Sequence, residues 1–482
     1  MTHVLDDTDD TRLGRAVAPP VSAHPGEAGI HALAHPHDAF AARALLADAA
    51  DKAIDAQYYM WHGDITGTLL FEKLWRAAER GVRVRLLVDD NNTAGLDGTL
   101  AALDSHPNLE VRLYNPLTHR RVRALSYALS PRRMNRRMHN KSLTVDNQAT
   151  VVGGRNVGDE YFGASQGMVF TDLDVLGLGP VVREVSTEFD RYWNSPSAVP
   201  AAGLLPEASA EDVRRLESRF ASIRSDPEAE EYLRALRERR LVKQLLEGRL
   251  TLEWTQAQVV SDDPAKTLDT ERRNDLLLLP RMLELMERPL KTMDLVSPYF
   301  VPMEDGTAIF QELARSGVRV RVLTNSLAAT DVSAVHAGYA KRREALLEAG
   351  VQLFELQRAP GAAEGDRGLW GSSSASLHAK TFAVDGARAF VGSFNFDPRS
   401  ARLNTEMGVV IESPALARGL AEWFDTRVPL LAYEVKRTGD GDLYWVERTE
   451  SGEKRYDTEP GAGFFLRSWV GFLSLLPIER EL

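Results

Sequence analysis

Alternating apolar and polar positions mark two strands that occur once in each half of the chain. "RGVRVRLLVDD" at residues 80–90 has a counterpart, "SGVRVRVLTNS", at residues 316–326. Strict alternation over this length is typical of a half-buried β-strand. Each segment follows a stretch with helical periodicity, at residues 68–79 and 308–315. The pattern therefore predicts an internal repeat built from helix–strand units.

Other strand-like segments flank both units in the same order. "DAQYYMW" (55–61) and "DLVSPYFV" (294–301) precede the helices, while "LEVRLYN" (109–115) and "VQLFEL" (351–356) follow the alternating strands. Each half therefore reads strand–helix–strand–helix–strand. Such alternation is typical of an α/β fold. We predict two pseudo-symmetric α-β-α sandwich halves, with one active site at their interface.

The chain of 482 residues is too long for one ordinary core, and its composition changes along its length. We predict a first half at residues 25–200, a charged helical insertion at 201–265 and a second half at 266–431. Residues 432–482 are expected to form a C-terminal hairpin over "ESGEK" and an apolar amphipathic helix.

The apolar tail, "AGFFLRSWVGFLSLLPI" at residues 462–478, carries a single charge, Arg467. It is short for a membrane span. Its aromatic residues suit a helix lying in a membrane interface, and they equally suit a helix packed on the protein's own core. The N-terminus is acidic and has no apolar core segment, so we expect neither a signal peptide nor a transmembrane helix.

Composition and charge narrow the class of protein. The hydrophobic fraction of 44% and the charged fraction of 26% are those of a soluble globular protein. The absence of cysteine excludes disulfides, thiolate metal sites and cysteine catalysis. A net charge of −11 argues against a protein that mainly grips nucleic acid. However, no acidic residue lies between His119 and Val145, and this basic run predicts either a solvated face or a landing site for anionic phosphates.

The candidate chemistry lies in a motif that occurs once in each half, H-x-K-x4-D-x6-G-[GS]-x-N. Its positions in the first half are His139, Lys141, Asp146, Gly153, Gly154 and Asn156, and in the second half they are His378, Lys380, Asp385, Gly392, Ser393 and Asn395. Finding the full set twice in the same place of the repeat is not expected by chance.

Strand parity separates the members of the motif. Residues i and i+2 share a face of a strand, so His139 and Lys141 point the same way, as do their counterparts in the second half. Asp146 and Asp385 have the opposite parity, and Asp385 precedes a glycine as in a hairpin turn. A structural role and a catalytic role are both open for these two aspartates.

Two such motifs suit displacement at phosphorus. One histidine would attack and the other would protonate the leaving oxygen, while Lys141 and Lys380 would stabilise the phosphoryl charge. We expect Asn156, Asn395 and Ser393 to bind phosphate oxygens. A histidine in this role needs an orienting acceptor, and alignment of two downstream strands assigns Asp174 and Glu406 to it. No metal-ligand cluster is evident in the sequence, so we expect no metal and no cofactor.

The doubled motif resembles the signature of the phospholipase D superfamily. Together with "QYYMWHGDITGTLL", "RRMHNKSLTVDNQATVVGGRNVGDEYFG", "LTNSLAATDVSAVHAGYA" and "LHAKTFAVDGARAFVGSFNFDPRSARLNTEMG", it is similar to the bacterial cardiolipin synthases of the C type. The resemblance runs from about residue 25 to the C-terminus. It implies a phosphatidyltransferase that forms a phosphohistidine, with phosphatidylethanolamine as donor and phosphatidylglycerol as acceptor.

The resemblance also implies roles and a location. His139 would be the nucleophile and His378 the acid and base, although the near-symmetric sequence does not decide between them. The expected partners are phospholipids and the bacterial membrane surface, with the chain peripheral on the cytoplasmic face of the inner membrane and no nucleic acid bound. A phospholipase D-type hydrolase, a phosphodiesterase or nuclease of the superfamily, and a non-catalytic lipid-binding scaffold are the alternatives.

Overall fold

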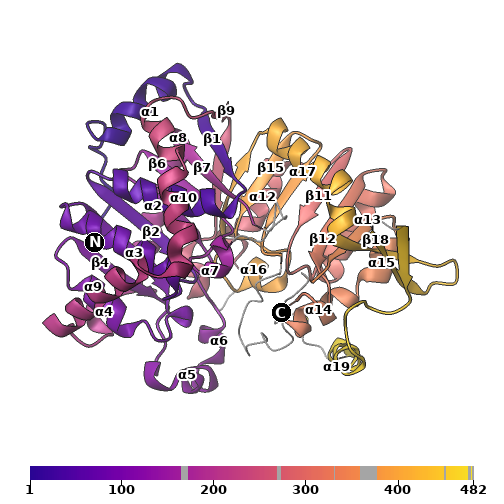
Figure 1. Cartoon of the computed structure of the whole chain (residues 1–482). Helices are drawn as coiled ribbons and strands as arrows, with labels where there is room; N and C mark the ends of the chain where they lie inside the picture. Colours follow the sequence, from indigo (N-terminus) through magenta and orange to yellow (C-terminus); the bar gives the residue numbers. More distant parts are fainter. Residues whose placement is uncertain are drawn as a thin grey trace. The chain divides into compact units, whose positions relative to one another are not determined.

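A computed structural model describes residues 1–163, 172–268, 273–330, 332–358, 377–449, 452–475 and 479. The chain divides into two compact units (Figure 1). The first unit holds Met1–Leu278 and Leu403–Val409, and the second holds Leu279–Arg402 and Val410–Leu482. The boundary predicted at residue 265 therefore lies before the observed one, and a short segment of the second repeat belongs to the first unit.

In the described part of the chain, the sheet of the first unit has nine strands in the order β8-β4-β3-β2-β5-β6-β7-β1-β9. These strands are β1 (Ala28–Leu33), β2 (Ala53–Tyr58), β3 (Arg83–Asp89), β4 (Leu109–Tyr114), β5 (Lys141–Val145), β6 (Ala149–Gly153), β7 (Asp174–Leu178), β8 (Ala198–Pro200) and β9 (Glu253–Thr255). β2, β3 and β4 run parallel, whereas β5 is antiparallel to both β2 and β6.

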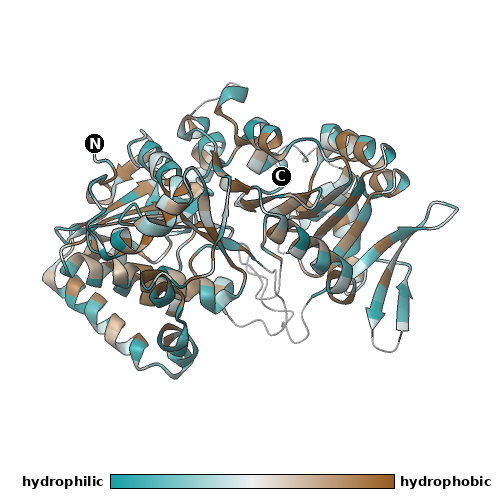
Figure 2. Ribbon diagram, turned by 90° about the horizontal axis from the view of Figure 1, so that it is seen from above, coloured by the Kyte–Doolittle hydropathy of each residue, from teal (hydrophilic) through white to brown (hydrophobic). Residues whose placement is uncertain are grey.

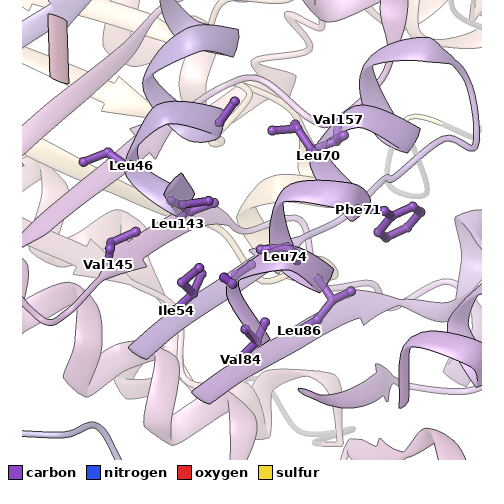
Figure 3. Close-up of a cluster of buried hydrophobic side chains, with 14 of the residues drawn as sticks. Leu46, Ile54, Leu70, Phe71, Leu74, Val84, Leu86, Leu143, Val145 and Val157 are labelled. Carbon is purple, nitrogen blue, oxygen red and sulfur yellow. The ribbon is translucent and has the colours of Figure 1, made fainter. Parts of the chain in front are cut away.

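Helices cover both faces of this sheet. α2 (Pro36–Ala49) and α3 (Ile65–Glu79) pack on one face; Figure 3 shows their leucines, such as Leu74, against Ile54 and Leu86. α8 (Pro180–Trp193) packs on the other face, where Leu87 contributes to a separate cluster. Because successive residues of β3 face opposite sides, one alternating strand supplies both cores.

The remaining helices of the first unit include the predicted insertion. They are α1 (Arg12–Ala23), α4 (Asp97–Asp104), α5 (Arg123–Leu129), α6 (Pro131–Met134), α7 (Asp159–Phe162), α9 (Ala210–Arg224), α10 (Glu230–Glu238) and α11 (Leu241–Leu246). α9, α10 and α11 form the helical part of the insertion and pack on α2 and α3. Their apolar faces extend the core of the first unit.

The second sheet has ten strands among the described residues, in the order β10-β16-β15-β14-β11-β12-β13-β17-β18-β19. They are β10 (Ala257–Ser261), β11 (Thr292–Val296), β12 (Arg319–Asn325), β13 (Gln352–Leu356), β14 (Thr381–Val384), β15 (Arg388–Gly392), β16 (Met407–Ile411), β17 (Ala432–Arg437), β18 (Leu443–Thr449) and β19 (Gly452–Tyr456). β11, β12 and β13 are parallel, and β14 is antiparallel to β11. The strands β2, β3, β4 and β5 of the first unit pair in the same way, as the sequence repeat predicts.

Helices of the second unit are α12 (Leu278–Met286), α13 (Met303–Arg315), α14 (Ser333–Ala340), α15 (Arg343–Glu348), α16 (Pro398–Arg402), α17 (Pro414–Thr426), α18 (Val428–Leu431) and α19 (Phe464–Leu475). In Figure 2 the helices alternate between hydrophilic and hydrophobic residues along their length. This alternation is expected where one face of a helix covers a sheet and the other meets solvent.

The repeat extends to a buried ion pair. Arg85 of β3 donates to both carboxylate oxygens of Asp55 at 2.7 and 2.8 Å, and Arg321 of β12 does the same to Asp294 at 2.6 and 3.0 Å. The paired geometry suits the planar guanidinium. Both pairs therefore tie the second strand of each parallel trio to the first.

The C-terminal segment adds a meander and a helix to the second unit. The predicted hairpin is formed by β18 and β19, and its residues 450–451 lie outside the described part. β17 joins this hairpin to β13. α19 packs through Val470 against Leu327 and Ala337 near α14; residues 476–478 of the predicted helix lie outside the described residues.

The opposite side of α19 is exposed. Its exposed apolar side chains are Phe464, Phe465, Trp469, Phe472 and Leu475. Of the helices that the structure describes, none combines the length and the apolarity needed to cross a bilayer.

Candidate active site

His139 lies immediately before β5 and is held at three points. Its backbone N–H donates to the carbonyl oxygen of Thr405 at 2.8 Å. Its Nδ1 lies 2.8 Å from Oε2 of Glu406, and its ring meets that of Tyr59 edge-on at 4.9 Å between centroids. A carboxylate at Nδ1 fixes the proton on that nitrogen and leaves Nε2 as the nucleophilic position. Glu406 thus lies where the sequence predicted an orienting carboxylate.

Lys141 is the first residue of β5 and is 1% exposed. Its ammonium donates to the carbonyl oxygen of His139 and lies 5.4 Å from the centre of the Tyr59 ring. These contacts fix the position of the ammonium. The charge and the imidazole therefore lie on one face of the strand, as parity predicts.

Glu406 is itself held by a buried ion pair that the sequence did not reveal. Its backbone N–H donates to Oδ2 of Asp262 at 2.8 Å, and its carbonyl oxygen accepts from the N–H of Asp262 at 3.0 Å. Lys266 lies 2.9 Å from the same carboxylate. Burial raises the pKa of Asp262 to about 6, although Lys266 and two backbone N–H groups oppose this shift. No local pattern marks Asp262, because its contact to Glu406 is made by residues far apart in sequence.

Each repeat also has a polar residue that positions the backbone before its motif histidine. Asp89, the last residue of β3, accepts from the backbone N–H of Met138 at 2.8 Å and from Arg137 at 3.1 Å. Asn325, the last residue of β12, accepts from the N–H of Leu377 at 3.0 Å and donates back to its carbonyl oxygen at 3.3 Å. Each residue thus fixes the backbone just before a motif histidine. The sequence did carry a signal for Asp89 and Asn325, because they end the two alternating strands β3 and β12.

The second motif repeats the local geometry of the first. Lys380, 2% exposed, donates to the carbonyl oxygen of His378, as Lys141 does to that of His139. Ser393 is fully buried. Asn395 is also buried, and its side-chain oxygen has no hydrogen-bond partner within the described residues. By contrast, Asn156 accepts from the N–H of Met60 at 3.3 Å. The second motif therefore offers a polar atom that a ligand can use.

The two motif aspartates act on the backbone. Asp146 accepts from the N–H groups of Lys52 and Ala53 at 2.8 and 2.9 Å, and Asp385 accepts from those of Lys291 and Thr292 at 2.7 and 2.8 Å. Five residues of extended chain place Asp146 about 16 Å beyond Lys141. These contacts support the structural interpretation and do not support a direct catalytic role for either aspartate.

Asp174 does not have the surroundings of an orienting residue. It is fully buried, and Arg43 and Arg155 lie 2.9 and 3.2 Å from its Oδ2. These contacts do not support the predicted role, because two guanidinium groups already neutralise the carboxylate. Asp172, two residues earlier, is buried, and its Oδ1 occupies the space that a Cβ on residue 154 would need, so a glycine is required there. Aligning "TDLDV" with "TEMGV" sets Asp172 opposite Glu406. The alignment made from the sequence had set Asp174 there, two positions further along the strand.

Comparison with known proteins gives the family. Residues 43–193 and 282–428 match the family described as "Cardiolipin synthase, PLD-like domain". The chain belongs to this family. It is 47% identical over 470 residues to cardiolipin synthase C of Escherichia coli (strain K12), with 97% of this chain and 99% of that protein aligned. It is 29% identical to an uncharacterized protein of Helicobacter pylori, covering 98% of this chain and 93% of that protein.

A solved structure supports the fold. Phosphatidylserine synthase of Haemophilus influenzae Rd KW20 aligns with a TM-score of 0.56 at 13% sequence identity, covering 98% of this chain and 100% of that chain. At this identity the comparison shows the fold alone. The predicted resemblance and the predicted α/β fold of two phospholipase D-like halves are both confirmed.

Within this family member, most of the basic run is engaged by the chain itself. Arg120 pairs with Asp90 and Asp97, Arg136 donates to the carbonyl oxygen of Lys266 at 2.7 Å, and Arg137 holds Asp89. These arginines fix the loops before β5. Of the basic run, the exposed residues Arg132 and Arg133 therefore remain as candidates for binding anionic phosphates.

One cluster in the described part of the chain has the spacing of a metal site, formed by His62, Asp64 and Glu160. Its members have structural partners: Asp64 accepts from the backbone N–H groups of Gly67 and Asp159 at 3.0 and 2.7 Å. Glu160 lies 3.1 Å from Nδ1 of His62 and raises the pKa of that histidine. The cluster fastens the start of α3 to the segment after β6.

Proposed function

We propose that this chain synthesises cardiolipin by transferring the phosphatidyl group of phosphatidylethanolamine to phosphatidylglycerol. The observation that carries the proposal is the contact of His139 with Glu406 beside Lys141, in a chain 47% identical to a protein named cardiolipin synthase C. The imidazole is oriented and a cation lies on the same face, as attack on a phosphodiester requires.

The reaction proceeds in two displacements. Nε2 of His139 attacks phosphorus, so that an N–P bond forms while the P–O bond to ethanolamine breaks, and His378 gives its proton to the leaving oxygen. His378 then takes the proton of the free primary hydroxyl of phosphatidylglycerol as that oxygen attacks phosphorus. The N–P bond breaks, and cardiolipin leaves with both histidines restored.

The supporting groups follow from the same scheme. Lys141 and Lys380 stabilise the charge on the phosphoryl oxygens, and the amide N–H₂ of Asn395 and the hydroxyl of Ser393 donate hydrogen bonds to those oxygens. Asn156 holds the loop after β2 through the N–H of Met60, and we assign its amide N–H₂ group to the phosphate oxygens as well. Glu406 orients His139, and we assign the corresponding role for His378 to Asp172 in place of Asp174.

A transfer assay tests the proposal. Purified chain is incubated with headgroup-labelled phosphatidylethanolamine and with phosphatidylglycerol in mixed vesicles, and we expect cardiolipin and free ethanolamine in equal amounts. Phosphatidic acid alone would instead identify a hydrolase, because water then resolves the intermediate. DNA cleavage without lipid turnover would favour the nuclease.

Histidine variants test the assignment. His139→Ala and His378→Ala are each expected to abolish transfer, whereas His3→Ala, at an exposed histidine, keeps it. His378→Ala protein denatured in detergent at neutral pH, where the N–P bond of a phosphohistidine survives, should carry a phosphatidyl adduct that is absent from His139→Ala. An adduct in His139→Ala alone would reverse the two roles.

We further propose that the chain is peripheral on the cytoplasmic face of the bacterial inner membrane, attached through α19. The exposed aromatic side chains of this helix, such as Phe465 and Trp469, suit the boundary between headgroups and acyl chains. Release of the chain from membranes by Phe465→Ser with Phe472→Ser, but not by Leu290→Ser at an equally exposed site, would support this attachment. Retention of the double variant would contradict it.

A further inference from the structure

The segment from η2 (Arg120–Val122) through α5 and α6 has two different sides, and its inner side is fastened to the first unit. Arg123 donates to the carbonyl oxygens of Asp90 and Asn91, each at 3.1 Å. Tyr127 donates to the side chain of Asn91, and the hydroxyl of Ser126 accepts from the N–H of His119 at 2.8 Å. These contacts anchor the segment to the loop that follows β3.

The outer side is apolar. Val122, Leu125 and Leu129 are 59%, 40% and 64% exposed. Leu125 and Leu129 are four residues apart and share one face of α5, and Val122 immediately precedes this helix; α5 lies at the margin of the first unit in Figure 1. We call these three residues the α5 stripe. Because the inner contacts hold the backbone in place, the stripe cannot turn inward to bury itself.

The charge beside the stripe has one sign. Arg132 and Arg133 follow it and are exposed, and no acidic residue lies between positions 119 and 145. Arg133 donates to the carbonyl oxygen of Pro116 at 2.9 Å. Arg132 forms no side-chain hydrogen bond or ion pair with any described residue. Aliphatic side chains beside unneutralised arginines are the two components of binding to an anionic lipid surface.

We propose that the α5 stripe and Arg132 form a docking element for an anionic phospholipid bilayer. A protein partner would require roughly 800 Å² of surface from each side, more than three aliphatic side chains on two helical turns provide. A bilayer needs only side chains long enough to reach the acyl boundary and cations at headgroup level. The element is separate from α19 and recognises the charge of the membrane as well as its apolar interior.

The position of the element gives it a role in the reaction, and this step rests on the proposed function. Leu129 precedes the nucleophilic His139 by one short helix and a loop. Docking therefore brings the first motif to a membrane whose anionic lipid is the proposed acceptor, phosphatidylglycerol. Activity on bilayers should depend on the stripe, whereas activity on lipid dispersed as monomers should not.

A single-cysteine label tests the docking directly, because the natural chain contains no cysteine. Leu129→Cys carrying an environment-sensitive fluorophore should shift to shorter wavelength with vesicles of phosphatidylethanolamine and phosphatidylglycerol, and brominated acyl chains should quench it. Leu283→Cys, 50% exposed in the second unit, is the control and should not respond. No response at Leu129 while the chain sediments with vesicles would overturn the proposal.

Two further variants separate the components. Arg132→Gln should weaken binding to phosphatidylglycerol vesicles about fivefold, with no effect on phosphatidylcholine vesicles and none at high salt. Leu125→Ser with Leu129→Ser should slow transfer on vesicles at least tenfold but leave transfer between short-chain monomeric lipids unchanged. Equal losses on both substrates, or a change in oligomeric state, would overturn the proposal in favour of a structural role or a contact between copies.

The binding measurements do not depend on catalysis. If the wild-type chain transfers no phosphatidyl group but the Leu129 label still enters anionic vesicles, the proposed function fails and the docking element stands. If transfer occurs on vesicles and both the label and Arg132→Gln show no effect, the docking element fails and the proposed function stands.

Discussion

His139 has two ring nitrogens, and its surroundings distinguish them. Nδ1 is occupied by Glu406 at 2.8 Å, so a reacting phosphorus can be reached only through Nε2. The carboxylate also stabilises the positive charge that the ring gains when a bond forms at Nε2. In the proposed mechanism, the same contact therefore sets the geometry of attack and lowers its electrostatic cost.

Replacement of Glu406 by glutamine tests this contact. Glu406→Gln keeps the size of the side chain but removes its charge, and the amide can present its N–H₂ group to Nδ1 and so favour the wrong tautomer. We expect kcat to fall on the order of 10²-fold or more with little change in KM, and the pH profile to shift. Initial rates of transfer between pH 5 and 9 measure both effects.

Glu412→Gln, at an exposed carboxylate beyond the same strand, is the matched control and should retain wild-type rates. A Glu406→Gln protein with unchanged kcat and pH profile would show that the hydrogen bond has no part in catalysis.

At the residue scale, the sequence predicted what depends on spacing alone. Parity placed His139 and Lys141 on one face because side chains alternate regularly along a strand. Parity left the role of Asp146 open, because the contacts that indicate this role come from the backbone of residues 51–53. The alignment of two downstream strands gave Asp174 an orienting role that the structure does not support, and it could not reveal the two arginines that neutralise this carboxylate, because they come from distant elements.

At the element scale, Asp262 joins the end of β10 to the start of β16 through its hydrogen bonds with the backbone of Glu406, and Lys266 neutralises its carboxylate. Lys266 is 3% exposed, so its loss leaves a buried carboxylate without its cation. We expect Lys266→Met to destabilise the fold by about 3–5 kcal/mol near neutral pH. Denaturant unfolding followed by fluorescence measures this difference.

The pH dependence has a definite sign. The folded-state pKa of Asp262, about 6, exceeds the ordinary value of an aspartate, about 3.9, so folding favours its protonated form. The stability that this group contributes is largest at low pH and is lost as pH rises through about 6. Removal of Lys266 raises this pKa further, so the destabilisation should grow between pH 6 and 8.

Lys243→Met removes an exposed lysine whose nearest carboxylate is 3.9 Å away, and it should cost less than about 1 kcal/mol. A Lys266→Met protein that loses no more stability than this control, or loses the same amount at pH 5 and pH 8, would contradict the assigned ion pair.

Elements made by local pattern were predicted well. The alternating strands 80–90 and 316–326 became β3 and β12, and the charged segment of the insertion became α9, α10 and α11. The boundary near residue 265 differed because the backbone pairing of Asp262 with Glu406 joins residues far apart in sequence. No periodicity within residues 250–278 reports that pairing.

At the scale of the whole molecule, the proposed mechanism gives two fixed cations the part that a metal ion plays in many phosphoryl-transfer enzymes. Lys141 and Lys380 are buried, and each is held by a carbonyl oxygen of its own motif. We therefore expect transfer to continue at the wild-type rate after dialysis against excess EDTA. Cardiolipin formation with and without chelator measures this.

A loss of activity in EDTA that Mg²⁺, Ca²⁺ or Zn²⁺ restores would contradict this expectation. His62→Ala would then show whether the cluster of His62, Asp64 and Glu160 holds the ion.

The assignment of residues 403–409 to the first unit has an evolutionary consequence. The glutamate that orients the histidine of the first repeat is encoded within the second repeat. If the chain arose by duplication of a single-repeat gene, the ancestral polypeptide had to obtain its glutamate from another copy of itself. Such an ancestor would have worked only as a symmetric homodimer, and fusion of the two genes then freed each half to diverge.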